Sequence, residues 1–322
     1  MKAIEIRESG APEVMTVVDI PVPKPKANEA LVKITAAGVN FADVYVREGR
    51  YKSKLPMVIG QEAAGVVTEV GSEATTVKPG DHVAYRGVQG SYAEYAAVPA
   101  DKLVSIPKGL SDEQAAAAIL QGMTAQYLCY STYPVKRGDT VLVHAAAGGV
   151  GLLLVQMCHN LGARVIGTVS TVQKETLARE AGADEVILYS QVDFEAETRR
   201  LTGNQGVHVI YDAVGAATFT KGLNLLRPRG HMVNYGAASG QVAPIDPMVL
   251  MEKGSIYLSR PSLQHYAAIR AELEERSSAV FGMIAAGKLK LRIEHRYPLE
   301  KAVQAHRDLE SRKTTGKLLL LT

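Results

Sequence analysis

The sequence contains little of what disulfide-rich and membrane proteins depend on. Only two of its 322 residues are cysteine, which argues against a disulfide framework and against a cysteine-based zinc site. Cys129 and Cys158 both lie in apolar, helix-like stretches, so we expect two buried thiols. The longest apolar runs, such as 150–155 and 318–321, are far shorter than the roughly 18 residues that a membrane span needs. The opening residues, MKAIEIRESG, are typical of a strand and not of a signal peptide, so we expect a cytoplasmic protein.

An excess of charge of one sign is also missing. Lys and Arg number 36 against 33 Asp and Glu, and no stretch gathers five or six like charges, so nucleic acid is an unlikely partner. What is present is an ordinary globular balance, with 47% apolar and 21% charged residues. At about 150 residues per domain, the length predicts two domains.

The first 110 residues or so predict irregular β structure. Gly and Pro punctuate short β-rich runs at 31–35, 63–70 and 82–85. Ser111 and Gln114 then show the spacing of a capping box, which predicts the start of a helix that links two domains.

From residue 140 the pattern changes to apolar strands separated by helical stretches, which predicts a doubly wound parallel sheet. The six expected strands are 141–145, 164–169, 185–189, 207–214, 230–236 and 255–259. A helix at 268–287 and strands at 289–298 and 316–322 follow, without βαβ spacing of their own. We therefore expect an α/β protein in which residues 1–122 and 261–322 form a β-rich domain around an inserted nucleotide-binding domain at 123–260.

The most informative local motif is a glycine loop between the first of these strands and a helix. The segment HAAAGGVG fits the dinucleotide-binding pattern G-x-G-x-x-G, except that Ala146 stands in the first position. Gly148 would let the backbone approach a pyrophosphate, and Gly151 would allow close helix–strand packing. The helix N-terminus would attract the anion. The alternative is a tight turn without a ligand.

The end of the second strand indicates which cofactor the loop takes. An Asp or Glu there would bind the free 2′-hydroxyl of NAD(H). The sequence has instead Thr168, Ser170, Thr171 and then Lys174, which favour the 2′-phosphate of NADP(H). The alternative for Lys174 is a solvated position on a helix.

The sequence as a whole resembles the zinc-independent quinone oxidoreductases of the medium-chain dehydrogenase/reductase superfamily. The resemblance rests on AGVNFADVYVREGRY, GQEAAGVV, PGDHVAY, HAAAGGVG, GTVSTVQK and SRPSL. It implies a GroES-like substrate domain, a Rossmann cofactor domain, a cleft between them and a homodimer, which in this chain would pair through the strand at 255–259.

The resemblance also shows where this chain departs from the zinc alcohol dehydrogenases of the same superfamily. Asn40 and Gln61 stand where those enzymes have Cys and His ligands, and amides are poor zinc ligands. The eight histidines show no i, i+4 pairing, so we expect no metal. Without a Lewis acid, hydride transfer to an acceptor that is already electrophilic, a quinone or an enone, is the natural chemistry.

The resemblance implies four catalytic candidates, Asn40, Asp43, Tyr45 and Tyr51. Tyr45 would donate a hydrogen bond or a proton to the reduced oxygen, and Tyr51 would form a wall of the acceptor pocket. For Asn40 and Asp43, the alternative is that they only hold the loop.

The resemblance further implies a set of residues that contact NADPH, with Tyr189 near the adenine and Lys174 at the 2′-phosphate. Gln121, where several relatives have Lys, and Ala213, where some have Ser, depart from the family pattern. The set comprises Phe41, Ala42, Asp43, Val44, Tyr45, Tyr127, Gly148, Gly149, Val150, Ser170, Thr171, Lys174, Tyr189, Ala213, Tyr235, Gly236, Ala237, Ala238, Leu258, Ser259, Arg260 and Arg312.

These observations predict an NADPH-dependent quinone reductase that works without metal. One alternative is an NADPH-dependent enone or alkenal double-bond reductase, because hydride transfer to a β-carbon needs almost the same geometry. The other is a non-catalytic NADPH-binding protein with a structural or RNA-binding role, which the near-neutral charge does not favour.

Overall fold

The computed structural model describes all 322 residues, which divide into two compact units. Unit 1 comprises Met1–Met123 and Ala267–Thr322, and unit 2 comprises Thr124–Tyr266. The C-terminal tail thus belongs to the same unit as the first 123 residues.

Unit 1 is built on a seven-stranded sheet with the order β15-β16-β3-β5-β6-β8, in which β7 also pairs with β3. The β runs expected near its start are confirmed as β3, β5 and β6. The strands are β3 (Glu29–Val39), β5 (Glu62–Val70), β6 (His82–Arg86), β7 (Tyr95–Pro99), β8 (Val104–Ser105), β15 (Ile293–Pro298) and β16 (Lys317–Leu321). A smaller sheet contains β1 (Lys2–Ile6), β2 (Met15–Asp19) and β4 (Met57–Val58).

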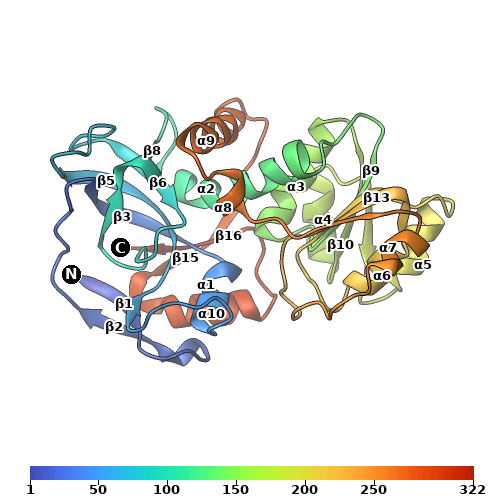
Figure 1. The fold of residues 1–322 in the computed structure, drawn as a ribbon, viewed down its shortest axis with the longest axis horizontal. Helices are drawn as coiled ribbons and strands as arrows, with labels where there is room; N and C mark the ends of the chain where they lie inside the picture. Colours follow the sequence, from blue (N-terminus) through green and yellow to red (C-terminus); the bar gives the residue numbers. More distant parts are fainter. The chain divides into compact units, whose positions relative to one another are not determined.

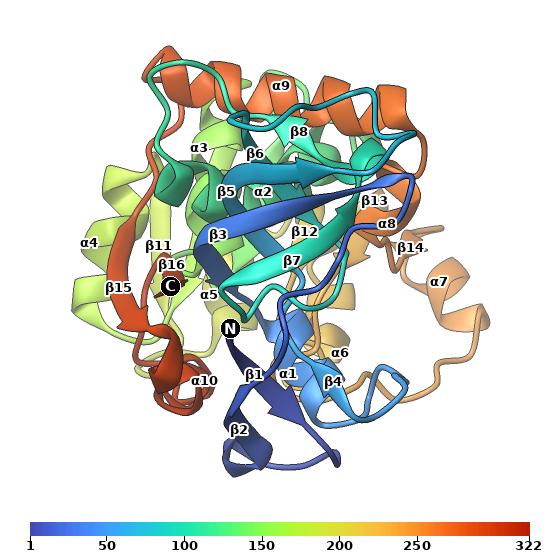
Figure 2. The ribbon, with the colours of Figure 1, turned by 90° about the vertical axis from the view of Figure 1, so that its left-hand side faces the viewer.

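The tail completes the larger sheet through β16, which pairs antiparallel with β3. β15 and β16 are parallel neighbours joined through α10 (Ala302–Glu310), so the expectation that the tail lacks a βαβ arrangement is wrong. The buried face of α10 consists of Ala302, Ala305 and His306, and these residues give a weak apolar signal in the sequence. In Figure 2, α10 lies beside β15, and α9 (Arg270–Ala285) lies along β8.

Unit 1 has a dense apolar core. Ile4, Ile34, Val39, Tyr85 and Leu320 are all at most 2% exposed and belong to one cluster. The short helix α1 (Phe41–Arg47) follows β3 directly, so the end of a buried strand fixes its position.

Unit 2 is a six-stranded sheet with the order β11-β10-β9-β12-β13-β14, and every neighbouring pair is parallel. This confirms the predicted doubly wound sheet, although β13 begins four residues earlier than expected. The strands are β9 (Thr140–His144), β10 (Arg164–Val169), β11 (Glu185–Leu188), β12 (Val207–Asp212), β13 (Leu226–Asn234) and β14 (Tyr257–Ser259).

Helices connect these strands and cover the sheet. α3 (Gly149–Asn160) packs against β9 and β10, and α4 (Val172–Glu180) packs against β10 and β11 (Figure 1). The remaining helices of the unit are α5 (Phe194–Leu201), α6 (Phe219–Leu223), α7 (Met248–Glu252) and α8 (Leu263–Tyr266). Because the six strands are parallel, their carboxyl ends all lie at one edge of the sheet. Sheets of this kind bind nucleotides at that edge.

The helix predicted after Ser111 is confirmed as α2 (Asp112–Tyr127), which spans the division between the units. Its capping box forms, since Ser111 N–H donates to Gln114 Oε1 (2.9 Å) and Gln114 N–H donates to Ser111 Oγ (3.2 Å). Cys129 and Cys158 are both buried and free, as expected. None of the helices is long and apolar enough to span a bilayer.

Candidate active site

The glycine loop of unit 2 has the geometry of an anion-binding helix start. Gly148 is the N-cap of α3 and provides no side-chain cap, so the first backbone N–H groups of the helix keep their binding capacity. A β-carbon at Gly151 would lie 2.1 Å from the Ala145 carbonyl oxygen, so only glycine fits there. Ala145 itself adopts the left-handed conformation, with a φ of 53°. The loop therefore fits a pyrophosphate group.

The end of β10 carries polar groups and no carboxylate. Thr168 is turned inward, where its hydroxyl lies 2.9 Å from Nδ1 of the buried His144, so Thr168 serves the core. The half-buried Ser170 and the exposed Thr171 follow, and Thr171 caps α4 by accepting from the Lys174 N–H. Ser170, Thr171 and Lys174 are thus the hydroxyl and ammonium groups that follow this strand end.

The chain segments after β12 and β13 approach so closely that only glycine fits at position 236. A β-carbon at Gly236 would lie 2.4 Å from the Ala213 carbonyl oxygen, and Tyr235 N–H donates to the Asp212 carbonyl (2.8 Å). The Ser259 hydroxyl is buried without a hydrogen-bond partner in the protein. An orphaned buried hydroxyl at this edge fits a bound ligand that completes its bonding.

Three further cofactor candidates of unit 2 differ in their surroundings. Tyr189 is 47% exposed, which suits stacking on a ligand ring. Tyr127 is buried and stacks on Tyr266 at a centroid distance of 4.4 Å. Arg260 donates to the Asn234 carbonyl oxygen (3.1 Å).

In unit 1, Asn40 lies at the centre of a buried polar cluster. Its Nδ2 donates to Glu62 Oε2 (2.8 Å) and to the Gly38 carbonyl (3.3 Å), while its Oδ1 accepts from Lys317 Nζ (2.8 Å) and Gln121 Nε2 (3.2 Å). An amide has two donor hydrogens and two acceptor lone pairs, so the protein fills the whole bonding capacity of Asn40.

The charge in this cluster is a buried ion pair between Lys317 and Glu62. The two side chains are 3% and 0% exposed. Glu62 also accepts from the Leu120 N–H (2.6 Å). A β-carbon at Gly38 would lie 2.0 Å from Glu62 Oε2, so glycine is required beside the pair.

Asp43 links this cluster to a second one. Its Oδ2 accepts from the Asn40 N–H (2.9 Å) and the Tyr92 hydroxyl (3.1 Å), and its Oδ1 accepts from Gln61 Nε2 (3.3 Å). Burial raises the pKa of the Asp43 carboxyl to about 7, against the lowering effects of the Asn40 N–H, the Lys317 charge and Gln61.

A hydrogen-bond chain reaches Asp43 from α10. Arg47 Nη1 lies 2.9 Å from His306 Nδ1, and His306 Nε2 lies 3.2 Å from the Tyr92 hydroxyl. Arginine can only donate, and burial together with the Arg47 charge lowers the pKa of His306 to about 3. The neutral ring therefore carries its hydrogen on Nε2 and donates to Tyr92, which donates to Asp43.

Aromatic rings lie on α1 and shortly after it. The rings of Tyr45 and Tyr51 meet edge to face at 5.5 Å, and Phe41 lies 6.2 Å from Tyr45. Tyr45 is buried, whereas Tyr51 is 48% exposed. Such a group can pack against a flat, apolar ring.

The positions that would hold zinc do not fit that metal. The Asn40 oxygen already accepts from an ammonium group, and the Gln61 amide nitrogen is bound to Asp43. No three His, Cys, Asp or Glu side chains are grouped as a metal site requires. The donor set is that of an internal hydrogen-bond network.

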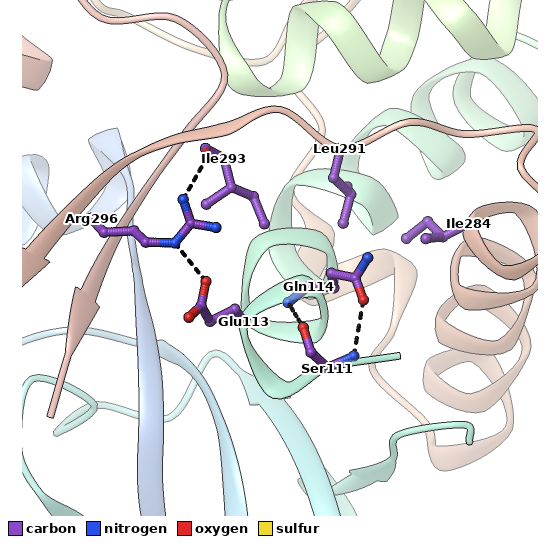
Figure 3. Close-up of a pocket in the computed structure, with 7 residues that line it drawn as sticks. All are labelled: Ser111, Glu113, Gln114, Ile284, Leu291, Ile293 and Arg296. Atoms are coloured by element: carbon purple, nitrogen blue, oxygen red, sulfur yellow. Dashed lines mark hydrogen bonds and ion pairs between the residues drawn. The ribbon is translucent and has the colours of Figure 1, made fainter. Parts of the chain in front are cut away.

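A hollow of about 400 Å³ on unit 1 is lined by none of the predicted site residues (Figure 3). Its polar groups pair with one another, since Arg296 binds Glu113 (2.7 Å) and Ser111 binds Gln114. Ile284, Leu291 and Ile293 complete its lining. Nothing in it matches the chemistry of the glycine loop or of the Asp43 network.

The predicted site residues divide between the two units. Asn40 to Tyr45, Tyr51 and Arg312 belong to unit 1, and the others belong to unit 2. Within unit 1, Asn40, Asp43 and Tyr45 are brought together on or next to α1, whereas Arg312 lies in an exposed turn with a φ of 59°. The roles of all these residues stay predictions.

Sequence reasoning missed five members of the network: Arg47, Glu62, Tyr92, His306 and Lys317. A signal existed for two of them. Glu62 and Lys317 each stand directly before an apolar run at the start of a strand, where a buried charge needs a partner. Nothing local marks the other three.

Comparison with known proteins assigns the two parts of the chain to two families. Residues 26–108 match the alcohol dehydrogenase GroES-like domain, and residues 149–275 match the zinc-binding dehydrogenase family. These matches confirm the expected combination of a GroES-like and a Rossmann-type domain.

Several relatives match over nearly the full length. Quinone oxidoreductase 1 of Escherichia coli is 43% identical, with 99% of this chain and 98% of the relative covered. A 2-haloacrylate reductase of a Burkholderia species is 41% identical with the same coverage. The solved structure of E. coli quinone oxidoreductase complexed with NADPH has a TM-score of 0.98 and covers 100% of both chains. A mycobacterial protein complexed with NADPH is 47% identical, with a TM-score of 0.97 and full coverage of both chains.

Proposed function

The chain belongs to the quinone oxidoreductases of the medium-chain dehydrogenase/reductase superfamily, and we propose that it reduces quinones with NADPH and without a bound metal. The observation that carries the proposal is the glycine loop next to a strand end without a carboxylate, in a chain whose full-length relatives are quinone oxidoreductases. Unit 2 would be the cofactor domain and unit 1 the substrate domain.

The residues of unit 2 would hold NADPH in an extended form along the carboxyl ends of the strands. Gly148, Gly149 and Val150 at the start of α3 would bind the pyrophosphate. Ser170, Thr171 and Lys174 would bind the 2′-phosphate, because a hydroxyl pair and a cation complement its charge. When bound, NADPH supplies the hydride. The further contacts would come from Tyr127, Tyr189, Ala213, Tyr235, Gly236, Ala237, Ala238, Leu258, Ser259 and Arg260, with Phe41 to Tyr45 and Arg312 from unit 1.

The proposed independence of zinc is supported by the buried network of unit 1. The Lys317 ammonium group occupies one side of Asn40, and a cation next to an ammonium group would be repelled. A quinone is already electrophilic, so its reduction needs positioning more than a Lewis acid.

The test is NADPH oxidation with 1,4-benzoquinone, 9,10-phenanthrenequinone and an enone, with and without EDTA and with NADH in parallel. We expect quinone turnover with NADPH that EDTA does not change. Loss of activity in EDTA and its recovery with zinc would refute the metal-free proposal. Cofactor binding without turnover of any acceptor would favour the non-catalytic alternative.

Reduction of an activated carbon–carbon double bond is the second candidate. It is favoured by the similarity to a 2-haloacrylate reductase at 41% identity, because a haloacrylate contains such a bond. The same acceptor panel decides, because an enone reductase would turn over the enone faster than either quinone.

We also propose a cytoplasmic homodimer. β14 is an edge strand of the sheet in unit 2, and its Tyr257 and Leu258 are 55% and 38% exposed. The free thiols Cys129 and Cys158 suit a reducing compartment. Sedimentation equilibrium at micromolar protein checks the dimer, and a monomer there would refute it.

A further inference from the structure

Gln61 differs from the other polar side chains around Asp43 because part of its bonding capacity is unused. Its Nε2 donates one hydrogen bond, to Asp43 Oδ1 (3.3 Å). Its second N–H and its Oε1 have no partner in the protein, and the side chain is only half-buried. Asn40, by contrast, is 5% exposed and saturated by protein groups. Of these two amides, Gln61 is the one that can bind a ligand.

The orientation of the Gln61 amide is fixed by its hydrogen bond to Asp43. Above its pKa of about 7 the Asp43 carboxylate accepts but cannot donate, so in this form it selects the amide nitrogen of Gln61. Asp43 is in turn held by the Asn40 N–H and by Tyr92, which His306 and Arg47 orient. Four of these side chains, those of Asp43, Tyr92, His306 and Arg47, are at most 1% exposed, so the anchor is rigid.

The helix that carries Asp43 also carries aromatic side chains, which suit a flat ring. α1 carries Asp43 together with Phe41 and Tyr45, and Tyr51 is joined to Tyr45 by a backbone hydrogen bond of 3.1 Å and a ring contact. One helix thus carries both aromatic rings and the carboxylate that anchors the N–H donor. A quinone presents an apolar ring and two acceptor oxygens, which need these two kinds of contact.

We propose that Gln61 is a specificity-determining residue, whose second amide N–H donates a hydrogen bond to a carbonyl oxygen of the bound quinone. Asp43, Tyr92, His306 and Arg47 are positioning residues that hold this amide. The inference rests on the proposed function. Quinone, one hydride from NADPH and one proton from solvent give hydroquinone and NADP+. The hydrogen bond strengthens during the reaction because the oxygen that it contacts becomes an anion before the proton arrives.

The experiment compares Gln61→Met with the wild type in two assays. The first measures the dissociation constant of 1,4-naphthoquinone for the enzyme loaded with NADP+, a complex in which no hydride can move. The second measures kcat and KM for the same quinone with NADPH. We expect quinone binding to weaken about 10-fold and kcat/KM to fall about 10- to 100-fold, as for the loss of a hydrogen bond to a developing anion. The dissociation constant of NADP+ should not change.

The chain offers a matched control in Gln304, an exposed amide that also donates to a single carboxylate, that of Asp308 (2.8 Å). Gln304→Met should leave both assays at wild-type values. If Gln61→Met also stays within twofold of the wild type in both assays, the inference is wrong.

The positioning chain is tested by a double-mutant cycle with Tyr92→Phe, which removes one hydroxyl from the chain. Alone, this change should weaken quinone binding and leave NADP+ binding unchanged. In the Gln61→Met background it should cause no further loss of quinone affinity, because the amide that it positions is gone. Equal losses in both backgrounds, or a loss of thermal stability alone, would show that Tyr92 serves only the fold.

Failure of this inference can be separated from failure of the proposed function. If the wild type binds the quinone but does not oxidise NADPH with it, the proposed function is wrong and the binding assay still decides the role of Gln61. If the wild type neither binds nor reduces quinones, both are wrong.

Discussion

Ala146 and Gly167 share one space: a β-carbon added at Gly167 would lie 2.8 Å from the β-carbon of Ala146. Ala146 stands where the dinucleotide motif has its first glycine, and Gly167 lies on the neighbouring strand β10. The departure from the motif is thus matched by a glycine opposite, which conserves the volume between loop and sheet.

This relationship predicts that Gly167→Ala destabilises the protein by about 1–3 kcal/mol, because it adds a methyl group to a filled space. Ala146→Gly in the same chain should restore most of that loss by exchanging the two volumes. Urea unfolding measures both. Gly282→Ala is the control, because Gly282 lies in α9 with open space around it and should gain stability as a helix residue. A Gly167→Ala variant as stable as the wild type would contradict the prediction.

The glycine loop could be predicted from the sequence because its determinants are local. Strand, turn and helix follow one another within about twenty residues, and the glycines mark the close approaches that the structure confirms at Gly151. The six strands of unit 2 were predictable for the same reason, since both faces of a covered parallel sheet are apolar.

The Asp43 network could not be predicted because its members meet only through the fold. Lys317 and Glu62 are 255 positions apart, and they pair because β16 and β5 both flank β3. His306 reaches Tyr92 across 214 positions from α10, a helix that the sequence pattern did not indicate. Strand order and register decide these contacts, and neither can be derived from spacing along one segment.

We predict that Lys317→Met destabilises unit 1 by about 3–5 kcal/mol, because it leaves the Glu62 carboxylate buried and without its partner. The change in free energy of unfolding in urea measures this. Glu62→Gln combined with Lys317→Met should recover part of the loss, because the uncompensated charge is gone. A loss in the single variant no larger than in the double variant would show that the ion pair contributes little.

We predict that Lys174→Ala weakens NADPH binding about 10-fold, the amount typical of one charge-assisted contact to a phosphate, and leaves NADH binding unchanged. The contrast follows because only NADPH carries the 2′-phosphate. Titration of the protein with each cofactor gives the two dissociation constants. Arg179→Ala is the control on the same helix, since Arg179 pairs with Glu175. Equal weakening of both cofactors would place Lys174 elsewhere in the site.

Asp43 and His306 should make opposite contributions to the pH dependence of stability. Burial raises the pKa of Asp43 from 3.8 to about 7. The contribution of Asp43 to the free energy of unfolding is therefore complete below about pH 4 and is lost as pH rises through 7. Burial and the Arg47 charge lower the pKa of His306 from 6.5 to about 3. The contribution of His306 to the free energy of unfolding is therefore complete above pH 6.5 and is lost as pH falls through 3. Between about pH 4 and 6.5 the two slopes oppose each other and nearly cancel in the wild type.

Asp43→Asn therefore should reveal the His306 contribution. In this variant the free energy of unfolding should rise with pH between 4 and 6.5 more steeply than in the wild type, by up to about 1.4 kcal/mol per pH unit. His306→Gln should shift the slope by a similar amount in the other direction. Asparagine and glutamine keep hydrogen-bonding groups at both positions, so the comparison isolates the protons. Urea unfolding at half-unit steps of pH measures the three profiles. Parallel profiles would mean that Asp43 and His306 bind protons in the folded protein as they do in the unfolded chain.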